Sequence, residues 1–83
     1  MTPVLDIDTR ADAGYVTLRD APVSRTVQFS TSVLVDLDSN GSPVGIEILT
    51  LTADVDVDGI AERYGLSAET REQLLTVLDR SRR

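Results

Sequence analysis

One stretch decides the fold, Val33-Leu-Val-Asp-Leu-Asp-Ser-Asn-Gly-Ser-Pro-Val-Gly-Ile-Glu-Ile-Leu49. Asn40-Gly41 at its centre favours a two-residue type I′ turn, because that turn requires positive φ at both central residues. A hairpin with this turn pairs apolar residues on one face, namely Leu37 with Val44, Val35 with Ile46 and Val33 with Ile48. Its other face receives the pairs Asp36 with Gly45 and Leu34 with Glu47. A slip of one residue would place the aspartates among the branched aliphatics, so the pattern fixes the register.

Alternating segments on either side of this hairpin predict further strands. Three of them precede it at short spacing, at residues 4–8, 14–19 and 24–30. Sequential strands at such spacing are typical of an antiparallel meander. Residues 54–58 alternate as well, and we expect a final strand there with Val55 and Val57 pointing inward.

The apolar spacing then changes to that of a helix, with Ile60, Ala61 and Tyr64 on one face. Asp56 or Asp58 is expected to cap this helix, and Gly65 to end it. Ser67 is expected to cap a second helix. The apolar stripe of that second helix is Leu74, Leu75 and Leu78. The sequence therefore predicts an α+β fold, with an antiparallel β-meander of four to five strands packed against two short C-terminal α-helices. We expect a single domain over residues 1–83, with the meander in 1–53 and a helical extension in 54–83.

Composition narrows the functional classes. The 83 residues carry a formal charge of −6, and all 8 basic residues are arginine. This charge argues against nucleic acids and anionic membranes as ligands and favours a basic protein partner. Cysteine and histidine are both absent, which excludes disulfides, thiolate chemistry and a histidine general base. Without a signal peptide or a membrane-spanning run, a cytoplasmic bacterial or phage protein is expected.

Two ordered motifs carry a family resemblance. The chain contains Asp12-Ala13-Gly14-Tyr15-Val16-Thr17-Leu18, followed by Val35-Asp36-Leu37-Asp38, Gly41 and Gly45-Ile46-Glu47-Ile48-Leu49. These motifs resemble those of the bacterial domain-of-unknown-function family 2283 (DUF2283), over roughly residues 5 to 50. The resemblance implies a compact β-rich fold and supplies no catalytic residue. Some members look like partners of small toxin-like proteins, which suggests an antitoxin-type or inhibitor-type role.

The hairpin also satisfies a calcium-loop pattern, with Asp36, Asp38, Asn40 and Glu47 as candidate calcium ligands. An EF-hand loop lies between helices, whereas both flanks of this segment are predicted strands. Pro43 also stands where such a loop normally has a branched aliphatic residue. We therefore expect no metal and no other cofactor, and keep calcium binding at 36–47 as an alternative function.

A second alternative is DNA binding through a helix-turn-helix-like segment. Residues 60–67, Ile-Ala-Glu-Arg-Tyr-Gly-Leu-Ser, resemble the first helix and turn of that motif. Arg71 departs from it, because an aliphatic residue normally packs the second helix at that place. The segment is also as acidic as it is basic, and phosphate contacts need net positive charge. Nucleic acid is therefore not the expected ligand.

The expected function is that of a non-enzymatic, acidic protein-interaction module. Asp36 and Glu47 form the one carboxylate pair suited to acid–base work, but no pocket or nucleophile accompanies them, so no catalytic residue is assigned. We expect Asp36, Asp38 and Glu47 to form the contact surface for a basic partner. Tyr15 and Phe29 are expected in the core or an interface. Homodimerisation is left open as a supplement to a small core.

Overall fold

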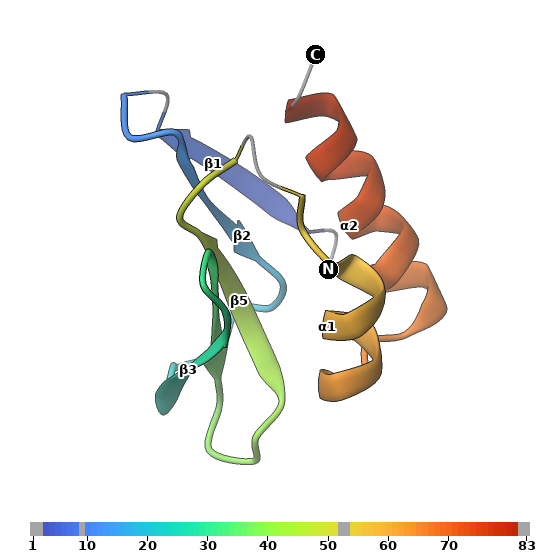
Figure 1. The fold of residues 1–83 in the computed structure, drawn as a ribbon. Helices are drawn as coiled ribbons and strands as arrows, with labels where there is room; N and C mark the ends of the chain where they lie inside the picture. The colour runs from blue at the N-terminus through green and yellow to red at the C-terminus, as the bar shows by residue number, and fades with distance from the viewer. Residues whose placement is uncertain (1–2, 9, 52–53, 82–83) are drawn as a thin grey trace.

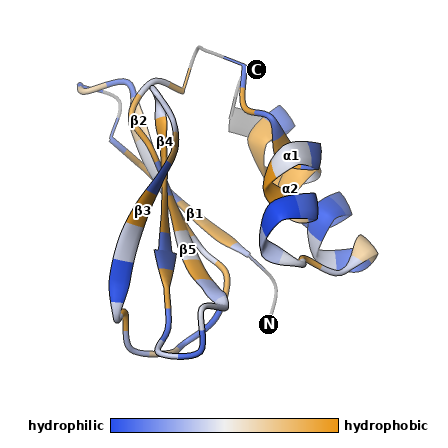
Figure 2. Ribbon diagram, turned by 60° about the horizontal axis from the view of Figure 1, so that its bottom comes forward, coloured by the Kyte–Doolittle hydropathy of each residue, from blue (hydrophilic) through white to orange (hydrophobic). Residues whose placement is uncertain are grey.

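A computed structural model describes residues 3–8, 10–51 and 54–81 of the chain. Within these ranges it contains five strands and two helices (Figure 1). Their bounds are β1 Val4–Asp8, β2 Ala13–Thr17, β3 Arg25–Ser30, β4 Val33–Leu37, β5 Pro43–Ile48, α1 Val57–Tyr64 and α2 Ala68–Ser81. All strands belong to one antiparallel sheet, and both helices cover the same face of it (Figures 1 and 2). The predicted α+β class is confirmed.

The strand order in the sheet is β1-β2-β5-β4-β3. Each strand lies next to its predecessor in sequence except at one step, because β2 pairs with β5 and not with β3. Leu18 N and Arg19 N both donate to Val44 O, at 2.8 and 3.2 Å, and so extend this pairing beyond the end of β2. As a result β5 is the central strand, and residues of β2 lie directly beside it.

The register of the β4–β5 hairpin is confirmed at four positions, where Val33, Leu34, Val35 and Asp36 have the predicted partners. The turn was predicted wrongly. Positive φ occurs at Gly41 (81°) but not at Asn40, and Gly41 N donates to Asp38 O at 3.1 Å while Asp38 N donates to Ser42 O at 2.9 Å. This is a three-residue loop with its glycine in the left-handed conformation. The pairing then shifts by one residue, so that Leu37 lies opposite Pro43 and not Val44.

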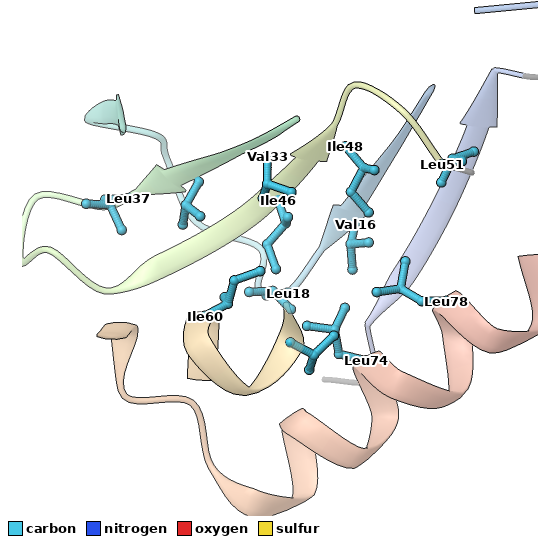
Figure 3. Packing of buried hydrophobic residues seen from close by; sticks show 12 residues of the cluster. Val16, Leu18, Val33, Leu37, Ile46, Ile48, Leu51, Ile60, Leu74 and Leu78 are labelled. Atoms are coloured by element: carbon cyan, nitrogen blue, oxygen red, sulfur yellow. The ribbon is translucent and has the colours of Figure 1, made fainter. Parts of the chain in front are cut away.

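One hydrophobic cluster joins the sheet to both helices. Val16, Ile46 and Val35, from three neighbouring strands, are each 0% exposed, and Ile60 and Leu74 of the helices are buried against them (Figure 3). Val27 and Phe29 are half-buried at the margin of this cluster, as predicted for β3. The free energy that holds the helices on the sheet therefore comes mainly from burial of these aliphatic side chains.

The helix boundaries match the capping signals. The Asp56 carboxylate accepts a hydrogen bond from Gly59 N at 2.9 Å, and Gly65 ends α1 in the left-handed conformation. Ser67 Oγ accepts from Thr70 N at 3.1 Å and caps α2.

Two expectations for this region are wrong. The strand expected at residues 54–58 is absent from their described backbone, because the Asp56 cap draws Val57 into the first turn of α1. The second concerns the apolar stripe of α2. Leu74 and Leu78 are buried, but Leu75 is 37% exposed, because a narrow stripe of i and i+4 positions suffices to cover the sheet.

Candidate functional site

The face of the sheet that is turned away from the helices carries the candidate site (Figure 2). Side chains of paired residues in neighbouring strands share a face. One row on this outer face runs through Asp6, Tyr15, Glu47 and Leu34, across β1, β2, β5 and β4. The next row runs through Thr17, Gly45, Asp36 and Thr26. The two rows bring Tyr15, Asp36 and Glu47, which come from three motif segments, into one area with Asp6 of β1.

Tyr15 crosses diagonally from the first row to the second. Its hydroxyl donates a hydrogen bond of 2.6 Å to Asp36 Oδ2, and Thr26 Oγ1 donates one of 2.5 Å to Asp36 Oδ1. A single carboxylate thereby connects β2 to β3 over the intervening strands. Gly45 lies under the phenol, and a Cβ added there would stand 2.0 Å from the Tyr15 hydroxyl oxygen. The position therefore requires glycine for a close approach of side chain to backbone.

The electrostatic surroundings keep Tyr15 protonated. Burial, followed by the hydrogen bond to Asp36 and the negative charges of Asp36 and Glu47, raises the pKa of Tyr15 to about 12. Each of these effects disfavours the phenolate. Tyr15 is therefore a neutral hydrogen-bond donor at physiological pH, which suits a role in binding or in structure and does not suit that of a base.

Asp38 is engaged by the turn rather than by the outer face. Its carboxylate pairs with the Arg19 guanidinium and accepts hydrogen bonds of 2.9 Å from the amides of Asn40 and Ser42. The hydrogen bond from Arg19, followed by that from the Ser42 amide, lowers the pKa of Asp38. The aspartate thus stabilises the three-residue loop by an Asx-type arrangement.

A shallow depression of about 190 Å³ lies beside Tyr15, lined by Asp6, Asp8, Ala13, Gly14, Tyr15 and Glu47. Asp6 and Glu47 lie on opposite sides of Tyr15 in the sheet, since each is a cross-strand partner of Tyr15. Asp8 Oδ1 accepts from the amides of Arg10 and Ala11 at 3.1 and 3.3 Å. The ion pairs within the described ranges involve Arg19 and Arg71, so no arginine there neutralises Asp6 or Glu47. The depression can therefore attract a cation.

The three residues predicted to form the contact surface thus have different surroundings. Asp36 is bound by Tyr15 and Thr26, Asp38 belongs to the loop, and Glu47 lines the depression. Sequence reasoning did not assign Tyr15 to this site, although it lies in the first motif. Asp6 was not a candidate either, because it lies outside both motifs and the pairing of β1 with β2 next to β5 is not visible in sequence order.

The calcium alternative gains no support from this geometry. Asp36 lies on β4 and Glu47 on the neighbouring strand β5. The Asp38 carboxylate accepts a hydrogen bond from the Asn40 amide in the loop. Among the described residues, no three carboxylates gather in a way that could hold a metal ion. An EF-hand would instead require the four candidate oxygens to converge on one point.

The helix pair lacks the features of a DNA reader. Arg71 donates to Asp58 Oδ1 of α1 at 2.5 Å and to Glu72 Oε1 at 2.6 Å. Leu74 and Leu78 pack on the sheet, which leaves Glu69 and Glu72 among the exposed residues of α2. Such a surface repels phosphate groups. Neither described helix is long and apolar enough to cross a lipid bilayer.

These features define a small α+β protein in which an antiparallel sheet presents its motif residues on an uncovered face. The family model described as "Protein of unknown function (DUF2283)" matches residues 5–51, more than half of the chain, and the protein belongs to this family. The matched residues comprise the sheet and end before α1. No curated protein and no solved structure matches the chain significantly.

Proposed function

We propose that this protein is a non-enzymatic interaction module that binds a basic protein through the outer face of its sheet. The observation that carries the proposal is the depression in which Asp6 and Glu47 flank Tyr15 without a neutralising arginine among the described residues. A lysine or arginine side chain placed there would meet a carboxylate on each side and an aromatic ring beside it. Both kinds of contact stabilise a bound cation.

The rest of the outer face supports such a role. Asp36 and Thr26 hold Tyr15 in place across the strands, so the ring is positioned before a ligand arrives. A preorganised side chain loses little conformational entropy on binding. The formal charge of −6 would also attract a basic partner over a longer range. An inhibitor-like or antitoxin-like role, in which a basic protein is held and neutralised, is the sharpest form of the proposal.

A binding assay with a defined cationic probe tests this proposal. Fluorescence anisotropy measures binding of a labelled arginine-rich peptide to the wild-type protein and to the double variant Asp6→Asn/Glu47→Gln. Both substitutions remove charge and leave the Tyr15–Asp36 hydrogen bond in place. Because an exposed ion pair contributes about 0.2–1 kcal/mol and two carboxylates lose their charge, we expect the peptide's Kd to rise roughly two- to thirtyfold.

The matched control is Glu62→Gln/Glu69→Gln, which removes the same formal charge at exposed positions of the two helices. If binding depends only on net charge, both double variants will weaken it equally, and the proposed site is wrong. A control close to wild type, together with a weakened outer-face variant, supports the site. Affinity capture from the host with the wild-type protein and with each of the two double variants would then identify the partner.

A further inference from the structure

The strand β3 forms one edge of the sheet, at the side opposite β1 (Figure 1). Backbone groups in an antiparallel strand alternate in direction between its two sides. On β4, Leu37 O accepts from Ser24 N, so alternate residues of β4 point toward β3, and the partners Arg25 and Val27 point back toward β4. The amides and carbonyls of Thr26 and Gln28 are therefore directed to the free edge.

The two edges of the sheet differ in charge. The β1 edge carries Asp6 and Asp8, and carboxylates on an edge strand discourage the addition of another strand. By contrast, the segment between Asp20 and Asp36, which contains β3, is the longest part of the chain without an acidic residue. For a protein of net charge −6, this segment is where a second copy can approach with least repulsion.

We propose that β3 pairs antiparallel with β3 of a second copy, about a two-fold axis at Val27. In this register Thr26 of each copy lies opposite Gln28 of the other, and these residues exchange their edge hydrogen bonds. Val27 faces Val27 of the second copy on the side of the helices. Arg25 approaches Phe29 of the second copy, where a guanidinium can lie against an aromatic ring.

The structure also limits how far this pairing extends. Gln28 Nε2 donates to Ser30 O at 3.0 Å, and the β3–β4 register shifts between these two residues. Ser30 pairs with Val33 of β4, so its backbone groups face β4 and do not extend the free edge. The regular part of the edge runs from Arg25 to Gln28 and fits the two-fold register, which needs only Thr26 and Gln28 as hydrogen-bonding residues.

Such a dimer would form one continuous sheet with the outer faces of both copies on the same side. The depressions beside Tyr15 lie toward the other edge, on β1, β2 and β5, and would stay open in both copies. Dimerisation through β3 is therefore independent of the binding proposed for the outer face. If both hold, the dimer offers two cation sites to one partner, which raises avidity.

Cysteine cross-linking tests the register. The chain has no cysteine, so Val27→Cys introduces a single thiol. Directly opposed residues that are not hydrogen-bonded place their Cβ atoms about 4.5 Å apart, close to the distance that a disulfide requires. We expect Val27→Cys to form a covalent dimer rapidly under mild oxidation. Ser39→Cys, an exposed position on the hairpin loop, serves as the control and should cross-link slowly.

Sedimentation velocity over a range of concentrations tests the contact without a cross-link. Gln28→Pro removes the edge amide and should leave the pairing of Val27 with β4 intact, which far-ultraviolet circular dichroism checks. We expect its dimer dissociation constant to rise about tenfold, because the symmetric contact loses one hydrogen bond from each copy. Gln28→Thr keeps the amide and should dimerise like wild type. A wild-type protein that stays monomeric at millimolar concentration, or equal cross-linking of the two cysteine variants, would overturn the proposal.

Discussion

The contact between Tyr15 and Gly45 leads to a quantitative prediction for the variant Gly45→Ala. The added Cβ would stand 2.0 Å from the phenol oxygen and 2.5 Å from Cζ, which real atoms do not tolerate. The backbone at Gly45 is held in the central strand between β2 and β4. We therefore expect the Tyr15 side chain to move away and to lose its hydrogen bond to Asp36.

The magnitude follows from the interactions that change. A hydrogen bond to a charged group contributes about 1.5–3 kcal/mol, and the ring also loses its packing on β5. Alanine in a strand interior is about 0.5–1 kcal/mol more favourable than glycine, which offsets part of the loss. We expect Gly45→Ala to lower the free energy of unfolding by about 2 kcal/mol. Urea denaturation followed by circular dichroism measures this difference.

A double-mutant cycle with Tyr15→Ala identifies the cause. If the steric conflict with the phenol is responsible, Gly45→Ala in the Tyr15→Ala background should be neutral or slightly stabilising. An equal cost in both backgrounds would refute the reasoning, because the effect would then lie in the strand backbone and not in the side chain that crosses it.

Three further outcomes are expected. In Asp36→Asn, the pKa of Tyr15 should fall from about 12 toward its ordinary value, as measured by ultraviolet absorbance during alkaline titration; an unchanged value would contradict the hydrogen bond. Asp38 has a lowered pKa, so its stabilisation is present above the ordinary aspartate value and is lost as the pH falls through the folded-state pKa. The free energy of unfolding of Asp38→Asn should therefore change less with pH than that of the wild type below about pH 4. Finally, Leu74→Ala should lower the free energy of unfolding by about 2–5 kcal/mol and Leu75→Ala by under about 0.5 kcal/mol, since only Leu74 is fully buried. Thermal or urea unfolding measures both values, and similar values for the two variants would mean that α2 packs differently.

Those features of the fold that depend on neighbouring residues in the chain could be predicted from the sequence. Strand alternation gave the register of Val33 to Asp36 against β5, and the capping residues gave both ends of α1. These features depend on neighbouring residues in the chain, which a single sequence displays directly. The turn failed because Asn-Gly also fits a loop in which the glycine alone has positive φ. Asp38, by accepting two loop amides, favours that loop.

The candidate site was only partly predictable. The motifs include Tyr15, Asp36 and Gly45, but their meeting requires β2 to lie next to β5, a long-range pairing that periodicity does not reveal. The hydrogen bond from Tyr15 also means that the Asp36 carboxylate is already used within the fold. Counting aspartates could not distinguish carboxylates used by the fold from those open to a ligand, such as Glu47.

The central claim is that a cation binds beside Tyr15 on the outer face. Nuclear magnetic resonance tests it most directly, by following the backbone amide signals while the arginine-rich peptide is titrated into the labelled protein. We expect the largest shifts at Asp6, Tyr15 and Glu47, on β1, β2 and β5, with little change in α2. Shifts that concentrate on the helices, or that spread evenly over all acidic residues, would contradict the account.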